Sequence, residues 1–358
     1  MSKNVVVCCD GTANEFAKHN TNVVKLYSVL RHDPATQVTY YHPGLGTMEP
    51  AGALTTVARR VTKLLGMAFG YGLPNDVRDA YVFLMGHFEP GDRVFLFGFS
   101  RGAYTVRALA GLIAARGLID AQAQDLTDKN EAYAMGATVW FDYRREALTA
   151  RGIGIGSIQE VAAELSGFVD RRPLPKLTKG VTIDTVAVWD TVGALGLPKF
   201  NRNFKRADVF EFVDTKLSPV VRRGVHAVAL DEQRADFTPT LWAADARVTQ
   251  VLFPGAHSDV GGGYPGTECG LSDGALQWMT TQLTDIGVRF APSPRFVPAP
   301  DPCGIAHEPW KHPPVLADTR TFTEPVTVHS SVRERTKCAS VVFDPGTLPR
   351  PYAPANLP

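Results

Sequence analysis

The sequence predicts an α/β fold, with a mostly parallel, doubly wound sheet and helices on both of its faces. Short apolar runs alternate along the chain with stretches of helical periodicity, which is typical of βαβ units. The apolar run at 94–97 leads into Gly-x-Ser-x-Gly at 98–102, and a helix-competent stretch follows at once. The chain has 358 residues, of which 44% are hydrophobic, and this suits one large domain with insertions.

The first half of the chain supplies four expected helices and three expected strands. Residues 5–9 form a continuous apolar run that ends in a turn, as a buried strand does. Thr21 is a candidate N-cap for a helix that continues to residue 30. The other expected elements are a strand at 38–41, helices at 54–67 and 74–88, the strand at 94–97, and a helix at 101–116 that ends at Gly117.

The second half is expected to complete the same domain. It supplies strands at 181–188 and 248–253, a helix at 271–286 and a β segment at 326–332. Residues 220–230 are interpreted as a helix. We therefore expect a single catalytic domain over 1–358, with insertions at about 121–180 (helical, or a lid) and 200–245 and a proline-rich C-terminal extension at about 291–358.

Charge and cysteine content exclude several classes of protein. The formal net charge of +1 lacks the basic excess that a general nucleic-acid binder uses, so no nucleic-acid partner is expected. Five cysteines without metal-ligand spacing favour a reducing compartment over a disulfide framework. The apolar run near the N-terminus is too short for the core of a signal peptide. We therefore expect cytoplasmic synthesis, and export only by a route that is independent of a signal peptide.

The Gly-x-Ser-x-Gly pattern makes Ser100 the candidate nucleophile. A serine hydroxyl needs a histidine base, and the histidine needs a carboxylate to orient it. Asp190 and His257 each follow a predicted strand, where catalytic groups of parallel sheets gather. The chain order Ser100, Asp190, His257 is that of the α/β-hydrolases. His329 is the reserve candidate for the base, and Asp190 could alternatively cap a turn.

The remaining site residues are expected around this triad. The amide of Arg101 is one candidate donor of an oxyanion hole, and the loop at Gly11 and Thr12 is the candidate source of the second. The insertions are expected to form acyl-binding walls or a lid. Candidate apolar contacts to the substrate are Tyr104 and Trp242, with Phe204, Phe210 and Phe212.

Two other functions stay open at this point. The chain could be a lipid-binding or assembly module that keeps the fold without turnover. It could also be a metal-assisted hydrolase that uses His257, Asp259 and Asp10. The primary interpretation requires no cofactor and no metal.

Several ordered motifs resemble the DUF2235 family of α/β-hydrolases, which includes Tle1-type phospholipase effectors of type VI secretion. The motifs are D-G-T at 10–12, G-F-S-R-G-A-Y at 98–104, V-W-D-T-V at 188–192, A-L-D-E-Q-R at 229–234, P-G-A-H-S-D-V-G-G-G-Y at 254–264, L-S-D…W-M at 271–279 and H-S-S-V-R-E-R at 329–335. The resemblance implies Ser100, Asp190 and His257 as the triad and ester hydrolysis as the reaction. It also implies a lipid or small-ester substrate, a membrane surface, and an immunity or secretion-apparatus partner.

Overall fold

A parallel β-sheet forms the centre of the protein. The computed structural model describes residues 2–11, 19–44, 73–150, 173–193, 215–311, 317–354 and 356–357. Its main strands are β1 (Asn4–Cys9), β2 (Gln37–His42), β3 (Arg93–Phe99), β6 (Ile183–Trp189), β7 (Val221–Ala229), β8 (Val248–Phe253) and β9 (Thr327–Val328). These strands pair in the order β2-β1-β3-β6-β7-β8-β9, and every pairing is parallel. The predicted α/β fold is confirmed.

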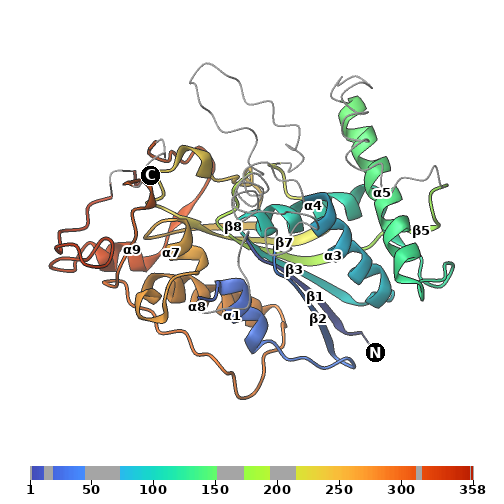
Figure 1. Ribbon diagram of the computed structural model, residues 1–358, viewed down its shortest axis with the longest axis horizontal. Coiled ribbons are helices and arrows are strands. Elements are labelled where there is room, and N and C mark those ends of the chain that lie inside the picture. The colour runs from blue at the N-terminus through green and yellow to red at the C-terminus, as the bar shows by residue number, and fades with distance from the viewer. Residues whose placement is uncertain are drawn as a thin grey trace, which may run out of the picture.

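Helices cover both faces of this sheet (Figure 1). One face carries α3 (Leu73–His87), α4 (Arg101–Arg116) and α5 (Lys129–Ala150), and the other carries α1 (Asn22–Val29), α7 (His257–Gly261) and α8 (Gly270–Asp285). Side chains of alternate residues in β1 enter two different cores: Val5 and Val7 pack with the first group, and Val6 and Cys8 with the second. Because both faces are buried, the strands read as continuous apolar runs.

The strand order reverses beside β1, and this positions the site. β2 lies on one side of β1 and β3 on the other, so the chain changes direction across the sheet between β1 and β3. Ligands of open α/β sheets bind at the carboxyl ends of the strands near such a reversal. β3 ends immediately before Ser100, and β6 ends immediately before Asp190.

The helix expected at 220–230 was wrong, because these residues form the inner strand β7. Arg222 and Arg223 are exposed at its start, and the remainder is buried between β6 and β8. Burial on both faces removes the alternation of polar and apolar residues that marks a strand, and a continuous apolar run fits either element. The expected insertion at 200–245 therefore contains part of the central sheet.

Described residues beyond 291 pack against the edge of the sheet at β8. β9 pairs with β8, and α9 (Ser330–Arg335) follows directly, so the β segment expected at 326–332 is only two residues long. Val332, Val341 and Tyr352 form a third apolar cluster with side chains from β7 and β8. This C-terminal segment thus contributes its own part of the core.

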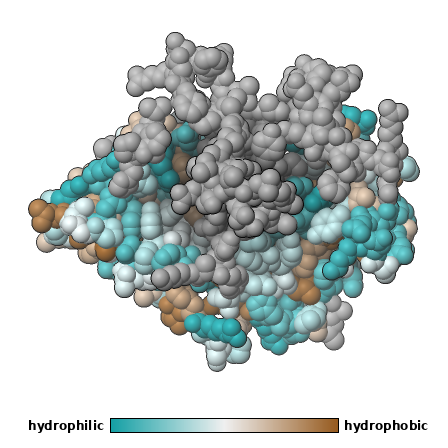
Figure 2. Space-filling view, viewed as in Figure 1, coloured by the Kyte–Doolittle hydropathy of each residue, from teal (hydrophilic) through white to brown (hydrophobic). Residues whose placement is uncertain are grey.

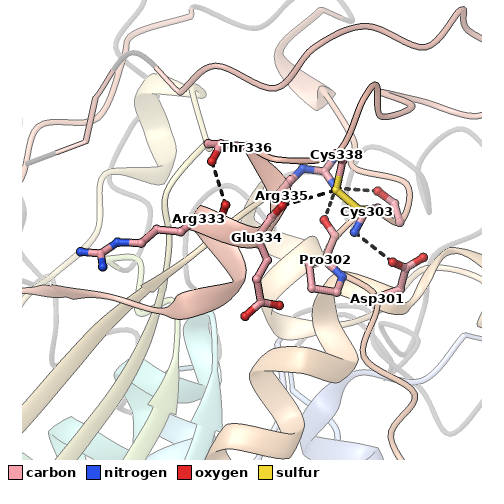
Figure 3. The surroundings of a disulfide bond; sticks show 9 residues. Asp301, Pro302, Cys303, Arg333, Glu334, Arg335, Thr336 and Cys338 are labelled. Atoms are coloured by element: carbon pink, nitrogen blue, oxygen red, sulfur yellow. Dashed lines mark hydrogen bonds between the residues drawn. A yellow bond between two sulfur atoms is a disulfide. The ribbon is translucent and has the colours of Figure 1, made fainter.

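A disulfide joins Cys303 to Cys338, next to α9 (Figure 3). The sequence-based expectation that the cysteines favour a reducing compartment without disulfides was wrong for this pair. The two cysteines are 35 residues apart, and only the folded chain brings their Cα atoms to 6.0 Å. Cys8, Cys9 and Cys269 are free and buried.

The first expected insertion, 121–180, contains α5 and the short strand β5 (Leu177–Thr178), which pairs with β4 (Leu118–Ile119). The expected helix at 54–67 lies outside the described residues. In the described part of the chain, no helix has the length and apolar character needed to cross a bilayer. Figure 2 shows polar residues over much of the described surface of this face, with hydrophobic residues in small separate groups.

Candidate active site

Ser100 lies at a sharp turn between β3 and α4. Its backbone has φ 58° and ψ −122°, a conformation that side-chain-bearing residues rarely adopt, and its amide donates to the Trp189 carbonyl at 3.1 Å. The flanking glycines make the turn possible. A Cβ on Gly98 would lie 2.5 Å from the Gly102 carbonyl oxygen, and one on Gly102 would overlap the Cys9 carbonyl.

Asp190 follows β6 and also has a positive φ, 34°. Its amide donates to the Ala227 carbonyl at 2.7 Å, and its Oδ1 accepts from the Ala229 amide at 2.9 Å. The next amide, that of Thr191, donates to Nε2 of the buried His226 at 3.0 Å. Backbone and side chain of this turn are therefore held by the neighbouring strand β7.

His257 opens the short helix α7, just after β8, and connects the other two residues. Its Nδ1–H donates to Asp190 Oδ2 at 2.5 Å, and its Nε2 accepts from Ser100 Oγ at 2.8 Å. This assignment of the ring proton follows from the carboxylate, which can only accept. The rings of Phe99 and Phe237 lie 4.6 Å and 4.9 Å from the imidazole, measured between centroids.

Burial and neighbouring charges set the protonation of this array. Burial opposes the ionisation of Asp190, but the Arg320 charge and the His257 hydrogen bond outweigh it and lower the pKa of Asp190 below its usual range. Burial also lowers the pKa of His257, and the Asp190 charge opposes this shift without cancelling it. At neutral pH the site therefore holds an ionised aspartate and a neutral histidine.

Two ion pairs surround the triad, and sequence reasoning did not predict either of them. Arg320 donates to both carboxylate oxygens of Asp190, at 2.7 and 2.9 Å. Glu232 accepts from the His257 amide at 3.1 Å and pairs with Arg234 at 2.7 Å. The only signal for Glu232 was its place in the A-L-D-E-Q-R motif, and Arg320 had none, because it comes from the proline-rich segment.

The predicted oxyanion donors have different surroundings. Arg101 is the first residue of α4, so its amide belongs to the first turn of the helix, where backbone N–H groups favour negative charge. The Gly11 amide donates to Asp10 Oδ1 at 2.7 Å. Gly11 can act as a donor to substrate only after that hydrogen bond breaks. Thr12 lies outside the described residues.

The predicted apolar contacts are buried in the protein interior. Tyr104 is 2% exposed and packs in the core between the sheet and α3–α5. Trp242 is also 2% exposed, and it lines a pocket of about 440 Å³ whose lining includes none of Ser100, Asp190 and His257. Phe204, Phe210 and Phe212 lie outside the described residues.

The residues of the alternative mechanisms have other partners. Asp10 accepts from Thr21 and Tyr41, at 2.6 and 2.9 Å, and Asp259 accepts from His307 at 2.7 Å. His329 caps α9 through its contact with the Ser331 amide. Within the part of the chain that the structure describes, no group of three His, Cys, Asp or Glu side chains is arranged to hold a metal ion.

This fold and this hydrogen-bonded array define an α/β protein with serine, histidine and aspartate side chains arranged as in serine hydrolases. The chain belongs to the family of Tle1-like phospholipase effectors of type VI secretion, because the family model for "T6SS, Phospholipase effector Tle1-like, catalytic domain" matches residues 3–282. The family membership that the motifs predicted is thus confirmed, and with it the catalytic domain of a lipid-hydrolysing family.

Individual relatives are more distant. The uncharacterized protein YEL023C of Saccharomyces cerevisiae is 31% identical over 242 residues, which make up 66% of this chain and 32% of that protein. Among solved structures, an uncharacterized protein from Pseudomonas aeruginosa is 18% identical with a TM-score of 0.40, covering 81% of this chain and 46% of its own. A Tle1 effector, solved bound to the VgrG spike of the type 6 secretion system, is 18% identical with a TM-score of 0.37, covering 74% of this chain and 51% of its own. The chain thus spans about a third of the yeast protein and about half of each solved chain.

Proposed function

We propose that the protein is a serine hydrolase that cleaves carboxylic esters of lipids or phospholipids through an acyl-enzyme. The observation that carries this proposal is the continuous hydrogen-bonded line from Asp190 through His257 to Ser100. Family membership supports the lipid class of substrate.

The proposed reaction has two halves. His257 Nε2 takes the Ser100 proton as Oγ attacks the ester carbonyl, and the imidazolium then gives that proton to the departing alcohol. Water, deprotonated by the same nitrogen, releases the acid from the acyl-serine. Asp190 keeps the proton on Nδ1 and stabilises the imidazolium in both halves.

The tetrahedral intermediate requires amide donors beside Ser100. We assign one to Arg101, whose amide belongs to the first turn of α4. The loop after β1, with Gly11 and Thr12, is the proposed source of the second. The close approach of that loop to the turn at Ser100 supports this assignment, because Gly102 lies against the Cys9 and Asp10 carbonyls.

The proposed setting is export to a membrane surface. Family membership supports a partner in the type VI secretion apparatus. The Cys303–Cys338 disulfide supports export, because disulfides persist in oxidising compartments and are rare in the cytosol.

The test compares wild type with Ser100→Ala on nitrophenyl esters of increasing chain length and then on phosphatidylcholine or phosphatidylglycerol vesicles. Loss of activity by about a thousand-fold or more is expected in the variant. Ser28→Ala is the matched control, because Ser28 lies on α1 and its hydroxyl donates to the Lys25 carbonyl. Equal rates in wild type and Ser100→Ala, or no hydrolysis by either, would overturn the serine mechanism and favour a lipid-binding module.

A further inference from the structure

Arg320 makes a buried, two-pronged contact with the carboxylate of Asp190. Nη1 donates to Oδ1 at 2.7 Å and Nη2 to Oδ2 at 2.9 Å, in the parallel geometry that a guanidinium and a carboxylate favour. The side chains are 3% and 0% exposed. Arg320 also donates to the carbonyls of Ala229 and Phe237, at 2.7 and 2.5 Å.

We propose that Arg320 is a positioning residue of this hydrolase, which orients the Asp190 carboxylate and sets the pH range in which His257 is a neutral base. The proposal rests on the proposed function, in which His257 is the base. It assigns a role in the site to a residue beyond 3–282, the part of the chain that the family model matches.

The orienting role follows from the contacts of the carboxylate. Oδ2 accepts from His257 and Arg320, and Oδ1 accepts from Arg320 and the Ala229 amide. Because these four donors approach from fixed directions, they hold the carboxylate in one orientation about its Cβ–Cγ bond. Without Arg320, each carboxylate oxygen would keep one of these donors. The carboxylate would then orient the His257 imidazole less firmly.

The electrostatic role follows from the charges that face His257. These are Asp190 and Arg320 on one side and the ion pair of Glu232 and Arg234 on the other, with Ser100 at Nε2. Each carboxylate is thus balanced by an arginine. Removing the Arg320 charge leaves an uncompensated carboxylate beside the imidazole, which favours the imidazolium and raises the pH at which His257 loses its proton.

The chain around Arg320 is itself held in place. Asn356 donates to the carbonyls of Arg320 and Leu230, at 3.3 and 2.8 Å, and the Asp318 amide donates to the Gln233 carbonyl at 2.6 Å. These contacts fix the segment against the loop that follows β7. The guanidinium therefore reaches Asp190 from a backbone anchored on both sides.

The test measures the acid limb of kcat/KM and, independently of turnover, the imidazole titration of His257 by NMR, with His257→Gln to identify the signal. In Arg320→Gln both midpoints are expected about one pH unit higher than in wild type. Arg335→Gln is the matched control: Arg335 is also fully buried, but it holds the carbonyls of Pro302 and Gly304, so its loss lowers stability without moving either midpoint.

Arg320→Lys separates charge from geometry. The lysine keeps the positive charge but not the two parallel bonds, so the midpoints stay near wild type while kcat falls about tenfold or more at unchanged KM. Unchanged midpoints in Arg320→Gln, or wild-type kcat in a folded Arg320→Lys, would overturn the proposal. If the NMR midpoint moves in a protein without esterase activity, the electrostatic effect of Arg320 on His257 is upheld, but the proposed function and the positioning role that rests on it fail.

Discussion

At the scale of single residues, backbone strain coincides with the candidate chemistry. Ser100, Asp190 and Asp344 are the described non-glycine residues with positive φ, and two of these three belong to the triad. Such conformations cost about 1–3 kcal/mol each and persist only where the surroundings enforce them. Here the close packing of the glycines around Ser100 and the hydrogen bonds between β7 and Asp190 hold the two residues in these conformations.

The pKa of His257 leads to a prediction about pH. Burial lowers this pKa from 6.5, and only the neutral imidazole can accept the serine proton. Activity is lost as pH falls through the pKa of the free enzyme, so a lowered pKa keeps the protein active at lower pH. We expect the acid limb of kcat/KM to have its midpoint below pH 6.5. A midpoint clearly above 6.5 would contradict the assigned environment.

The hydrogen-bonded array of Ser100, Asp190 and His257 was predictable from sequence, but the residues that surround it were not. The glycine pattern marks Ser100, and the ends of predicted strands mark Asp190 and His257, because those signals are local. Arg320 reaches Asp190 across 130 positions of the chain, and nothing in its immediate sequence reveals that contact. The Gly11 amide stays a predicted oxyanion donor, and its hydrogen bond to Asp10 could not be predicted from the sequence.

At the scale of elements, most helices and strands follow from local patterns. Thr21 accepts a hydrogen bond from the Val24 amide as an N-cap, as predicted. The helix α4, which follows Ser100, ends at Gly117, also as predicted. The strand β7 was missed because burial on both faces of the sheet removes the alternation of polar and apolar residues. The start of α9 was missed because Val332, which lies inside the helix, continues the alternate spacing of Val326 and Val328.

The disulfide leads to a prediction about stability. Linking residues 35 apart removes loop entropy from the unfolded chain, worth about 4 kcal/mol at most in the chain-entropy model. Replacing both Cys303 and Cys338 by serine should lower the unfolding midpoint by several degrees. Reductant should lower the wild-type midpoint toward that of the double variant and leave the double variant unaffected. A wild-type unfolding midpoint that reductant leaves unchanged would contradict the structure.

At the scale of the whole molecule, the sheet brings distant parts of the chain together at the carboxyl ends of its strands. Ser100, Asp190 and His257 follow β3, β6 and β8, and the C-terminal segment adds Arg320 and the cluster with Val332 and Tyr352. The segment predicted to be an extension contributes to the core and contacts the candidate site.

Deletion of residues 317–358 tests that integration. The truncated chain retains the residues that the family model matches, but it loses β9, α9 and the arginine on Asp190. We expect a lower thermal unfolding midpoint and loss of ester hydrolysis. A truncated protein with wild-type stability and activity would show that the segment is dispensable.

In the proposed mechanism, Ser100 carries the acyl group. The most direct measurement is the mass of the intact protein after treatment with a lipid-like fluorophosphonate, followed by peptide mapping. We expect one adduct, on the peptide that contains Ser100, and none in Ser100→Ala. An unmodified wild-type protein, or an adduct on another residue while ester hydrolysis stops, would contradict it.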